Sequence, residues 1–404
     1  MRALLVLGST GSIGTQALEV VRASPGRFRI EALAAGRSWR KLLEQAREFR
    51  PRLVAVTDPE AAAALRGELD PAVALVEGPQ ALEQVAAEAE YELAVHGVVG
   101  ARGLNPSVRV LERGRTLALA NKESLVLAGA ELMELARRSG AALLPVDSEL
   151  CAIHQCLRGE RARDVRRIVL TASGGPFRDA SPEELEQATP EAALRHPNWS
   201  MGPRITVGSA TLMNKALEVI EVHHLFGIAA ERIQVAIHRQ SLVHSLVELV
   251  DGSVLAQMGP PDMRGPLHYC LHHPERVAAP LAGFDAARFA VLSFEEVDPE
   301  RFPALELGYR CVAAAADAGA VLNAADEVAV EAFLERRIGF RDIVRVNAAV
   351  LERRPGLDGS IERLLEADRA ARELAREEIE ALRATRSGRI PAAAERDPTG
   401  RTRP

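Results

Sequence analysis

The sequence lacks several features that mark specialised classes of protein. Its four cysteines (Cys151, Cys156, Cys270 and Cys311) form no CxxC pair and no spaced zinc set, so we expect free, buried thiols in a reducing compartment. No apolar run reaches the length of a membrane span, and the N-terminus runs directly into an expected strand without room for a signal peptide. We therefore expect a cytoplasmic protein with no membrane partner.

A strong excess of one charge is also missing. Lys and Arg number 50 against 56 Asp and Glu, which gives a net charge of −6 and no reason to expect a nucleic-acid partner. The hydrophobic content of 47% and the charged content of 26% are typical of a globular protein. A length of 404 residues predicts two or three domains.

The N-terminal glycines are the most informative feature that is present. The apolar run 4–7 is followed by Gly8, Gly11 and Gly14, and then by a helical pattern from Thr15 to Ala23. A strand, a glycine-rich turn and a helix N-terminus can hold a pyrophosphate with backbone N–H groups. The spacing is GxxGxxG and not the usual GxGxxG, so a ligand-free tight turn is the alternative.

Strand and helix patterns alternate from residue 1 to about 150, which predicts an α/β fold with a parallel, Rossmann-like sheet. The expected strands are 3–7, 28–34, 52–56, 73–76, 93–96, 116–119 and 142–146, with helices such as 39–49 and 80–90. A central α+β domain is expected over 151–280, with a strand at 168–171 and a hairpin of strands 242–250 and 254–258 around Asp251-Gly252. A connector follows at 281–305, then a C-terminal helical domain at 306–384 and a disordered tail at 385–404.

The end of the second expected strand favours NADP(H) over NAD(H). No carboxylate stands there to take the ribose hydroxyls; the residues are Gly36, Arg37 and Ser38. A fixed positive charge and a hydroxyl suit a 2′-phosphate. The alternative is that Arg37 is only a solvated surface charge.

Acidic residues provide a candidate metal site. Asp147 and Glu149 follow an expected strand and would point the same way in an extended chain, where a divalent ion such as Mg²⁺ or Mn²⁺ would relieve their repulsion. If 210–221 is helical, Asn214, Lys215 and Glu218 share one face, with Ser209 at the helix start. Helix capping and a surface salt bridge are the ordinary alternatives.

Three further segments carry polar groups suited to a ligand. The turn 173–177 could wrap an oxyanion with its N–H groups, and the loop 196–202, which carries Trp199 and Met201, suggests a lid that excludes water. The segment 119–124 places Asn121, Lys122 and Glu123 after another strand. The alternative for 173–177 is a plain turn, and for 196–202 it is a loop that Trp199 attaches to the core. For 119–124 the alternative is the ordinary chemistry of a helix start.

Taken together, these motifs resemble the 1-deoxy-D-xylulose 5-phosphate reductoisomerase family. The resemblance rests on segments 8–14, 119–124, 146–149, 173–177, 196–202 and 209–218, extends through 240–245, 252–264 and 323–327, and covers residues 1 to about 380. It implies a homodimer whose subunit has an NADPH domain, a catalytic and dimer-forming domain with a flexible lid (about 186–202) and a C-terminal helical bundle. It also implies conversion of the phosphorylated sugar 1-deoxy-D-xylulose 5-phosphate to 2-C-methyl-D-erythritol 4-phosphate in the non-mevalonate isoprenoid pathway, with NADPH and a divalent metal (Mg²⁺, Mn²⁺ or Co²⁺).

The resemblance also implies roles for individual residues. The cofactor would be held by Thr10, Gly11, Ser12, Ile13, Gly36, Arg37, Ser38, Asn121, Glu123 and Gly202, and the metal by Asp147, Glu149 and Glu218. The substrate would contact Lys122, Ser148, Glu149, Ser173, His196, Trp199, Met201, Ser209, Asn214, Lys215 and Glu218, of which Lys122, Glu149, His196 and Glu218 would be catalytic. Gly208, Arg239 and the Arg37-Ser38 pair depart from the commoner family pattern.

Two other functions remain open on the sequence alone. An NADP-dependent dehydrogenase of the homoserine-dehydrogenase type would need no chelating carboxylates. A dinucleotide-sensing regulator would carry a DNA-binding module or a basic patch, and neither is visible. Within the favoured reaction, cleavage and re-formation of the C3–C4 bond and a direct 1,2-shift are both compatible with these residues.

Overall fold

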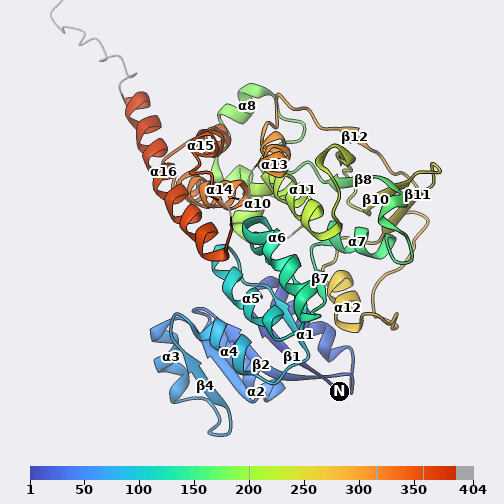
Figure 1. Cartoon of the computed structure of the whole chain (residues 1–404), viewed down its shortest axis with the longest axis vertical. Coiled ribbons are helices and arrows are strands. Elements are labelled where there is room, and N and C mark those ends of the chain that lie inside the picture. Colours follow the sequence, from blue (N-terminus) through green and yellow to red (C-terminus); the bar gives the residue numbers. More distant parts are fainter. Residues whose placement is uncertain (200, 315–316, 358, 388–404) are drawn as a thin grey trace, which may run out of the picture.

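The computed structural model describes residues 1–199, 201–314, 317–357 and 359–387. The expected tail lies outside the described residues from 388 onward, and so does Ser200 of the expected lid. Two sheets and a group of C-terminal helices make up the fold, with the first sheet at the bottom of Figure 1 and α16 (Ile361–Ser387) along one side. No helix in these residues is long and apolar enough to cross a bilayer.

The first sheet is parallel throughout, with the strand order β4-β3-β2-β1-β5-β6-β7. Its strands are β1 (Arg2–Leu7), β2 (Phe28–Ala35), β3 (Leu53–Val56), β4 (Ala74–Glu77), β5 (Leu93–His96), β6 (Thr116–Leu119) and β7 (Leu143–Pro145). The chain proceeds outward from β1 to β4 and then returns to β5, which pairs with the other side of β1, so the strand order reverses between β1 and β5. Ligands of doubly wound sheets bind outside the strand ends at such a switch point.

Helices cover both faces of this sheet because its strands are apolar on both sides. Leu4 and Val6 of β1 face one core, and Leu5 and Leu7 face the other. The first core contains α1 (Ser12–Arg22), α2 (Trp39–Phe49) and α3 (Pro59–Arg66), and the second contains α4 (Ala81–Glu88), α5 (Leu104–Glu112) and α6 (Lys122–Ser139). The predicted α/β class and all seven expected strands are therefore confirmed.

The second sheet is mixed, with the order β11-β10-β8-β9-β12, in which only β8 and β9 run parallel. Its strands are β8 (Val165–Ala172), β9 (Ile233–Ile237), β10 (Val243–Leu249), β11 (Val254–Met258) and β12 (Glu295–Glu296). The hairpin predicted around Asp251-Gly252 is confirmed, since β10 and β11 pair antiparallel. The short β12 lies within the segment expected to be a plain connector.

The remaining helices follow the second sheet or lie beside it. They are α7 (Ser148–Cys156), α8 (Pro182–Glu186), α9 (Pro190–Ala193), α10 (Pro203–Thr211), α11 (Met213–Phe226), α12 (Arg264–His272), α13 (Ala304–Ala313), α14 (Ala318–Leu334), α15 (Phe340–Glu352) and α16. One apolar core joins α10, α11 and the helices from α13 to α16. Although α12 lies between β11 and β12 of the second sheet in sequence, it packs against the first sheet, where Leu267 and Cys270 join the core beneath α1.

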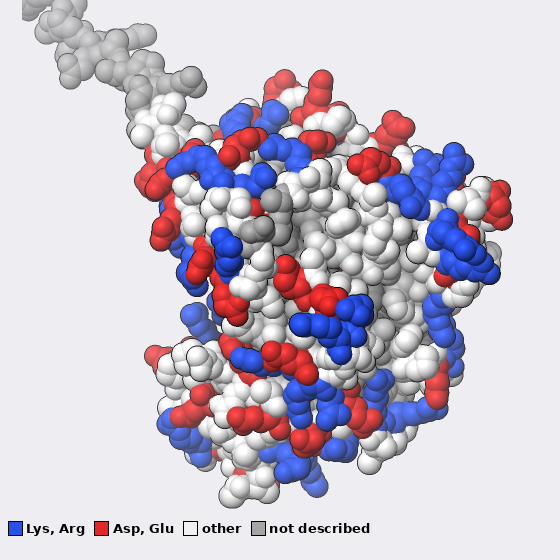
Figure 2. All heavy atoms as spheres, viewed as in Figure 1, with Lys and Arg blue, Asp and Glu red and all other residues white. Residues whose placement is uncertain are grey.

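Surface charges of both signs are interspersed over the face shown in Figure 2, in keeping with the nearly balanced composition. All four cysteines are free; Cys156 is half-buried and the other three are buried, so the expectation of burial is wrong for Cys156.

Candidate active site

The glycine turn after β1 forms the close contacts that its sequence suggested. Gly8 has a φ of +80°, and a Cβ there would lie 2.9 Å from the backbone of Gly97, in the loop after β5. A Cβ on Gly14 would lie 2.3 Å from the carbonyl of Gly8. Gly11 is the N-cap of α1 and offers no side-chain cap, and both Gly11 and Ser12 are exposed. The first-turn N–H groups therefore face the switch point without an internal partner from the cap, which suits an anion.

Cations gather beyond the end of β2. Gly36, Arg37 and Ser38 are exposed, and the Arg37 side chain is 91% accessible, with Asp58 at 3.5 Å. Lys41, which the sequence reasoning missed, donates from Nζ to the carbonyl of Thr10 over 3.0 Å. The available signal was its place in the first turn of the expected helix 39–49, directly after Arg37 and Ser38. This cluster joins the glycine turn to the expected 2′-phosphate region.

Asn121 is the N-cap of α6, and protein groups occupy its side chain. Its Oδ1 accepts from the N–H of Ser124, and its Nδ2 donates to the carbonyls of Val98 (2.8 Å) and Gly100 (3.0 Å). The capping alternative therefore holds for this residue, with Asn121 and not Glu123 or Ser124 as the cap. Its side chain fixes the loop after β5.

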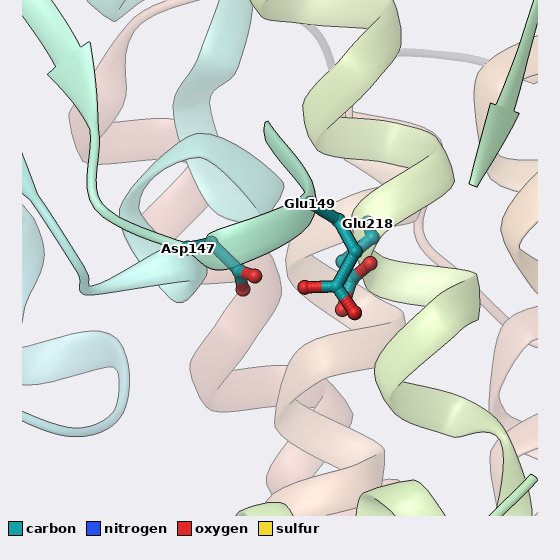
Figure 3. Close-up of side chains that lie close together, drawn as sticks. All are labelled: Asp147, Glu149 and Glu218. Carbon is teal, nitrogen blue, oxygen red and sulfur yellow. The ribbon is translucent and has the colours of Figure 1, made fainter. Parts of the chain in front are cut away.

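Three carboxylates converge at the start of α7, as Figure 3 shows. Asp147, Glu149 and Glu218 each offer an oxygen within 4.8 Å of the other two. The expectation of an extended chain at 147–149 is wrong, because α7 begins at Ser148 and Glu149 lies in its first turn. Asp147 occupies the N-cap position, but its side chain makes no capping bond and faces the cluster instead. Helix geometry, and not strand alternation, brings the two residues together.

Two buried lysines flank these carboxylates. Lys215 Nζ donates to Glu149 Oε1 and Glu218 Oε2, both over 2.5 Å. Lys122 Nζ donates to Asp147 Oδ2 (2.5 Å) and Asn214 Oδ1 (2.7 Å). The surface salt-bridge alternative for Lys215 and Glu218 is wrong, since both side chains are at most 5% accessible.

The electrostatics of the cluster suit a divalent cation. Burial, together with the charge of Glu149, raises the pKa of Glu218 to about 8. Burial also opposes ionisation of Asp147, but Lys122 and Lys215 outweigh it and lower its pKa to about 2. When all three carboxyl groups are ionised they outnumber the two ammonium groups, and the raised pKa of Glu218 reflects this repulsion. A divalent ion with oxygen ligands would relieve the repulsion and favour ionised Glu218. The donor set therefore fits Mg²⁺ or Mn²⁺.

The helix expected at 210–221 is interrupted. Leu212 has a φ of +60°, so it ends α10 and begins α11, and its buried side chain packs in the core of the second sheet. Ser209 therefore lies in the last turn of α10 and not at a helix start, which corrects the sequence-based placement. Asn214 and Lys215 stand in the first turn of α11. The bend at Leu212 therefore separates Ser209, at the end of α10, from Asn214 and Lys215, at the start of α11.

His196 joins the predicted phosphate-binding residues. Its Nε2 lies 3.2 Å from Ser173 Oγ and 3.0 Å from Ser209 Oγ. Its Nδ1 accepts from the N–H groups of Asn198 (3.2 Å) and Trp199 (2.9 Å), so the proton resides on Nε2. Burial and the charge of Arg178 lower its pKa to about 4. His196 is thus a neutral hydrogen-bond donor that points at two hydroxyls.

The expected oxyanion turn requires its glycines. Gly174 and Gly175 have φ of +81° and +67°, and a Cβ on Gly175 would lie 2.7 Å from the carbonyl of Ser209. A cavity of about 320 Å³ opens beside this turn, lined by residues 175–179 with Ala192, Arg195 and Pro197. Trp199 and Met201 are half-buried in the loop before α10, and Gly202 is its exposed N-cap.

The departures from the family pattern have simple structural accounts. Arg239 donates to both carboxylate oxygens of Asp179 and of Glu295, so it links the segment after the turn 173–177 to β12. A Cβ on Gly208 would make only ordinary contacts, the nearest at 3.6 Å from the N atom of Asn214.

A doubly wound sheet with a glycine turn, joined to an acidic, lysine-flanked site, defines a dinucleotide-dependent class of enzyme. Models of protein families identify the family within this class. The chain matches 1-deoxy-D-xylulose 5-phosphate reductoisomerase over residues 4–129, the C-terminal domain of that enzyme over 143–226 and the DXP reductoisomerase C-terminal domain over 258–374. The chain belongs to the 1-deoxy-D-xylulose 5-phosphate reductoisomerase family.

Individual relatives are similar to this chain in sequence and structure over nearly its whole length. The reductoisomerase of Anaeromyxobacter dehalogenans is 51% identical over 87% of this chain and 90% of its own length, and that of Chlorobaculum tepidum is 49% identical over 94% and 100%. The Zymomonas mobilis enzyme in complex with NADPH has a TM-score of 0.88 at 39% identity, covering 94% of this chain and 99% of the other. A reductoisomerase in complex with NADPH, fosmidomycin and magnesium has a TM-score of 0.90 at 37% identity, covering 95% and 99%. These similarities favour the reductoisomerase over a simple dehydrogenase.

Proposed function

We propose that this chain converts 1-deoxy-D-xylulose 5-phosphate to 2-C-methyl-D-erythritol 4-phosphate, with NADPH and a divalent metal, in isoprenoid precursor synthesis. The observation that carries the proposal is the convergence of Asp147, Glu149 and Glu218 within 4.8 Å, next to a helix pair rich in hydroxyl, amide and ammonium groups. A simple dehydrogenase has no use for this donor set. The complexes of relatives with NADPH and magnesium support the same conclusion.

The three carboxylates would hold the metal, which supplies Lewis-acid polarisation of the substrate ketone. The cofactor, which supplies hydride, would be held by Thr10, Gly11, Ser12 and Ile13 at the pyrophosphate and by Gly36, Arg37 and Ser38 at the 2′-phosphate, with Asn121, Glu123 and Gly202 nearer the substrate. Lys41, which donates to the carbonyl of Thr10, would add a cation next to the glycine turn.

The substrate phosphate would lie among Ser173, Ser209, Asn214 and Lys215. His196 donates from Nε2 toward the two hydroxyls, and so it orients them or the phosphate and does not act as a base. Lys122 and Ser148 lie beside the carboxylates, where they would hold substrate hydroxyls. Binding at the phosphate end then orients the carbon skeleton at the metal end.

The expected lid, at about 186–202, would close over this site, with Trp199 and Met201 excluding water. A homodimer would form through β11, an edge strand of its sheet that exposes Val254 and Met258. Free thiols suit a reducing cytoplasm, and Mn²⁺ suits the same oxygen donors as Mg²⁺.

The test is NADPH oxidation at 340 nm by purified protein with Mg²⁺ and 1-deoxy-D-xylulose 5-phosphate, with the product identified by NMR. We expect 2-C-methyl-D-erythritol 4-phosphate and no turnover after removal of the metal with EDTA. Reduction of the substrate without rearrangement of its skeleton, or full activity in EDTA, would contradict the proposal. Light scattering of wild type and of a Val254→Asp/Met258→Glu variant tests the dimer.

A further inference from the structure

A half-buried ion-pair junction lies apart from the carboxylate cluster, and of its members only Glu123 has a part in the proposed function. Its centre is Arg204, in the first turn of α10. The Arg204 guanidinium donates to Glu123 Oε1 (2.6 Å), Glu327 Oε1 (2.8 Å) and Asn323 Oδ1 (2.7 Å). One side chain therefore connects the start of α6, the helix after the lid loop and α14.

Glu327 extends the junction to the loop after β5. Its Oε1 accepts from the N–H of Ala101 over 3.1 Å, and its Oε2 accepts from Arg372 of α16 over 2.7 Å. A Cβ on Gly100 would lie 3.1 Å from Glu327 Oε1, so the carboxylate packs directly on this loop. A residue of the C-terminal helices thus holds a loop of the first sheet.

That loop lines the switch point of the first sheet. It follows β5, the neighbour of β1, and its Gly97 packs against Gly8 and Ile13 of the glycine turn. Dinucleotides bind outside the strand ends at this place in doubly wound sheets. Glu123, the second acidic acceptor of Arg204, also accepts from Asn121, which in turn donates to the carbonyl of Gly100. Both branches of the junction therefore end on the same loop.

We propose that Glu327, with Arg204, is a positioning residue for the dinucleotide: it fixes the loop 97–101 and Glu123 from the C-terminal helices. This inference rests on the proposed function, because it takes NADPH as the ligand at the switch point. Glu327 does not touch the dinucleotide itself and acts through Ala101 and Arg204. A charged junction suits this role, since loss of the Glu327 charge leaves the half-buried Arg204 and Arg372 without one of their acidic partners.

The test measures NADPH binding by the full-length protein in the absence of the sugar substrate. Quenching of protein fluorescence reports the binding. Glu327→Gln keeps the size of the side chain and removes its charge, and we expect its Kd for NADPH to rise at least tenfold. Glu378→Gln is the matched control, because Glu378 pairs with Arg353 over 2.7 Å on the same helical group away from the junction. Its Kd should stay within twofold of wild type.

Steady-state kinetics separate positioning from general damage. In Glu327→Gln the KM for NADPH should rise with the Kd, while kcat and the KM for the sugar phosphate change less than threefold. A Kd within twofold of wild type, or an equal loss in Glu378→Gln, would overturn the inference, as would an equal rise in both KM values.

Arg204→Lys is the second variant and decides the matter if Glu327→Gln does not fold. It keeps one positive charge but cannot reach Glu123, Glu327 and Asn323 together, so the Kd for NADPH should rise at least threefold; an unchanged Kd overturns the inference. Wild-type protein that fails to bind NADPH contradicts the proposed function as well. Wild-type protein that binds and turns over, beside variants that match it, contradicts only the role of the junction.

Discussion

Lys122 Nζ and Asp147 Oδ2 lie 2.5 Å apart and join the first residue of α6 to the residue before α7. The pair bridges the ends of β6 and β7, neighbouring strands of the first sheet. Although burial disfavours its charge, Asp147 and Glu218 raise the pKa of Lys122 well above its usual value. A fixed cation is thus part of the carboxylate cluster before any metal binds.

Glu218→Gln should abolish turnover and leave NADPH binding intact. The change removes one of three charged donors, so metal affinity should fall by more than the roughly 10–100-fold that loss of an outer partner costs. Isothermal titration with Mn²⁺ and with NADPH measures both effects. Activity near that of wild type would remove Glu218 from the metal site.

Lys215→Ala should raise the KM for the sugar phosphate by roughly 10–100-fold, a loss of about 1.4–2.7 kcal/mol. Because Lys215 also lies between Glu149 and Glu218, its removal should leave the affinity for a divalent ion unchanged or higher. Substrate kinetics and a Mn²⁺ titration test the two parts. An unchanged KM would exclude Lys215 from phosphate binding.

Arg37→Asp should shift the enzyme toward NADH. A carboxylate repels the 2′-phosphate and accepts from ribose hydroxyls, so the ratio of kcat/KM for NADPH over NADH should fall by roughly 100-fold or more. Arg47→Asp is the control, since Arg47 lies on α2, the helix that follows Arg37, but pairs with Glu68 at 3.1 Å. A retained preference for NADPH would make Arg37 a solvated surface charge.

Two glycine substitutions should change stability in opposite directions. Gly175→Ala places a Cβ 2.7 Å from the Ser209 carbonyl at a φ of +67°, and should destabilise the fold by about 1–3 kcal/mol while raising the KM for the sugar phosphate. Gly208→Ala lies inside α10 with room for a methyl group, and should stabilise by about 0.4–1 kcal/mol. Thermal melts of the two variants check the signs.

Stability should decline as the pH falls below about 6.5, and His96 contributes to this decline. Burial lowers the pKa of His96 to about 4; its Nε2 lies 2.9 Å from the carbonyl of Gly103, and its Nδ1 accepts from the N–H of Val98. The unfolded chain therefore takes up a proton between pH 6.5 and 4 that the folded chain does not, at a cost of about 3 kcal/mol. His96→Gln should flatten the dependence of Tm on pH in this window, and parallel curves would contradict this account.

The sequence predicted the parallel sheet well because its signals are local. The run 4–7, the glycines that follow it and the alternation of strands and helices need no knowledge of distant residues. The same holds for the hairpin at Asp251-Gly252, whose turn residues define its position.

Contacts between residues far apart in the sequence could not be predicted. Leu212 takes a left-handed conformation that its own sequence does not favour, because its side chain is buried in the core of the second sheet. Arg204 and Glu327 are 123 residues apart, and no local pattern in either segment predicts their contact. Asp147 and Glu149 were correctly expected to lie side by side, but for a wrong local reason, since a helix turn and not an extended strand sets their geometry.

The return of α12 to the first sheet has a practical consequence for dissecting the molecule. A fragment that ends near residue 150 would lack Leu267, Cys270 and Leu271, and the apolar surface beneath α1 would be bare to solvent. Such a fragment would aggregate when expressed alone. A soluble nucleotide-binding half calls for grafting residues 264–272 back onto it through a designed linker.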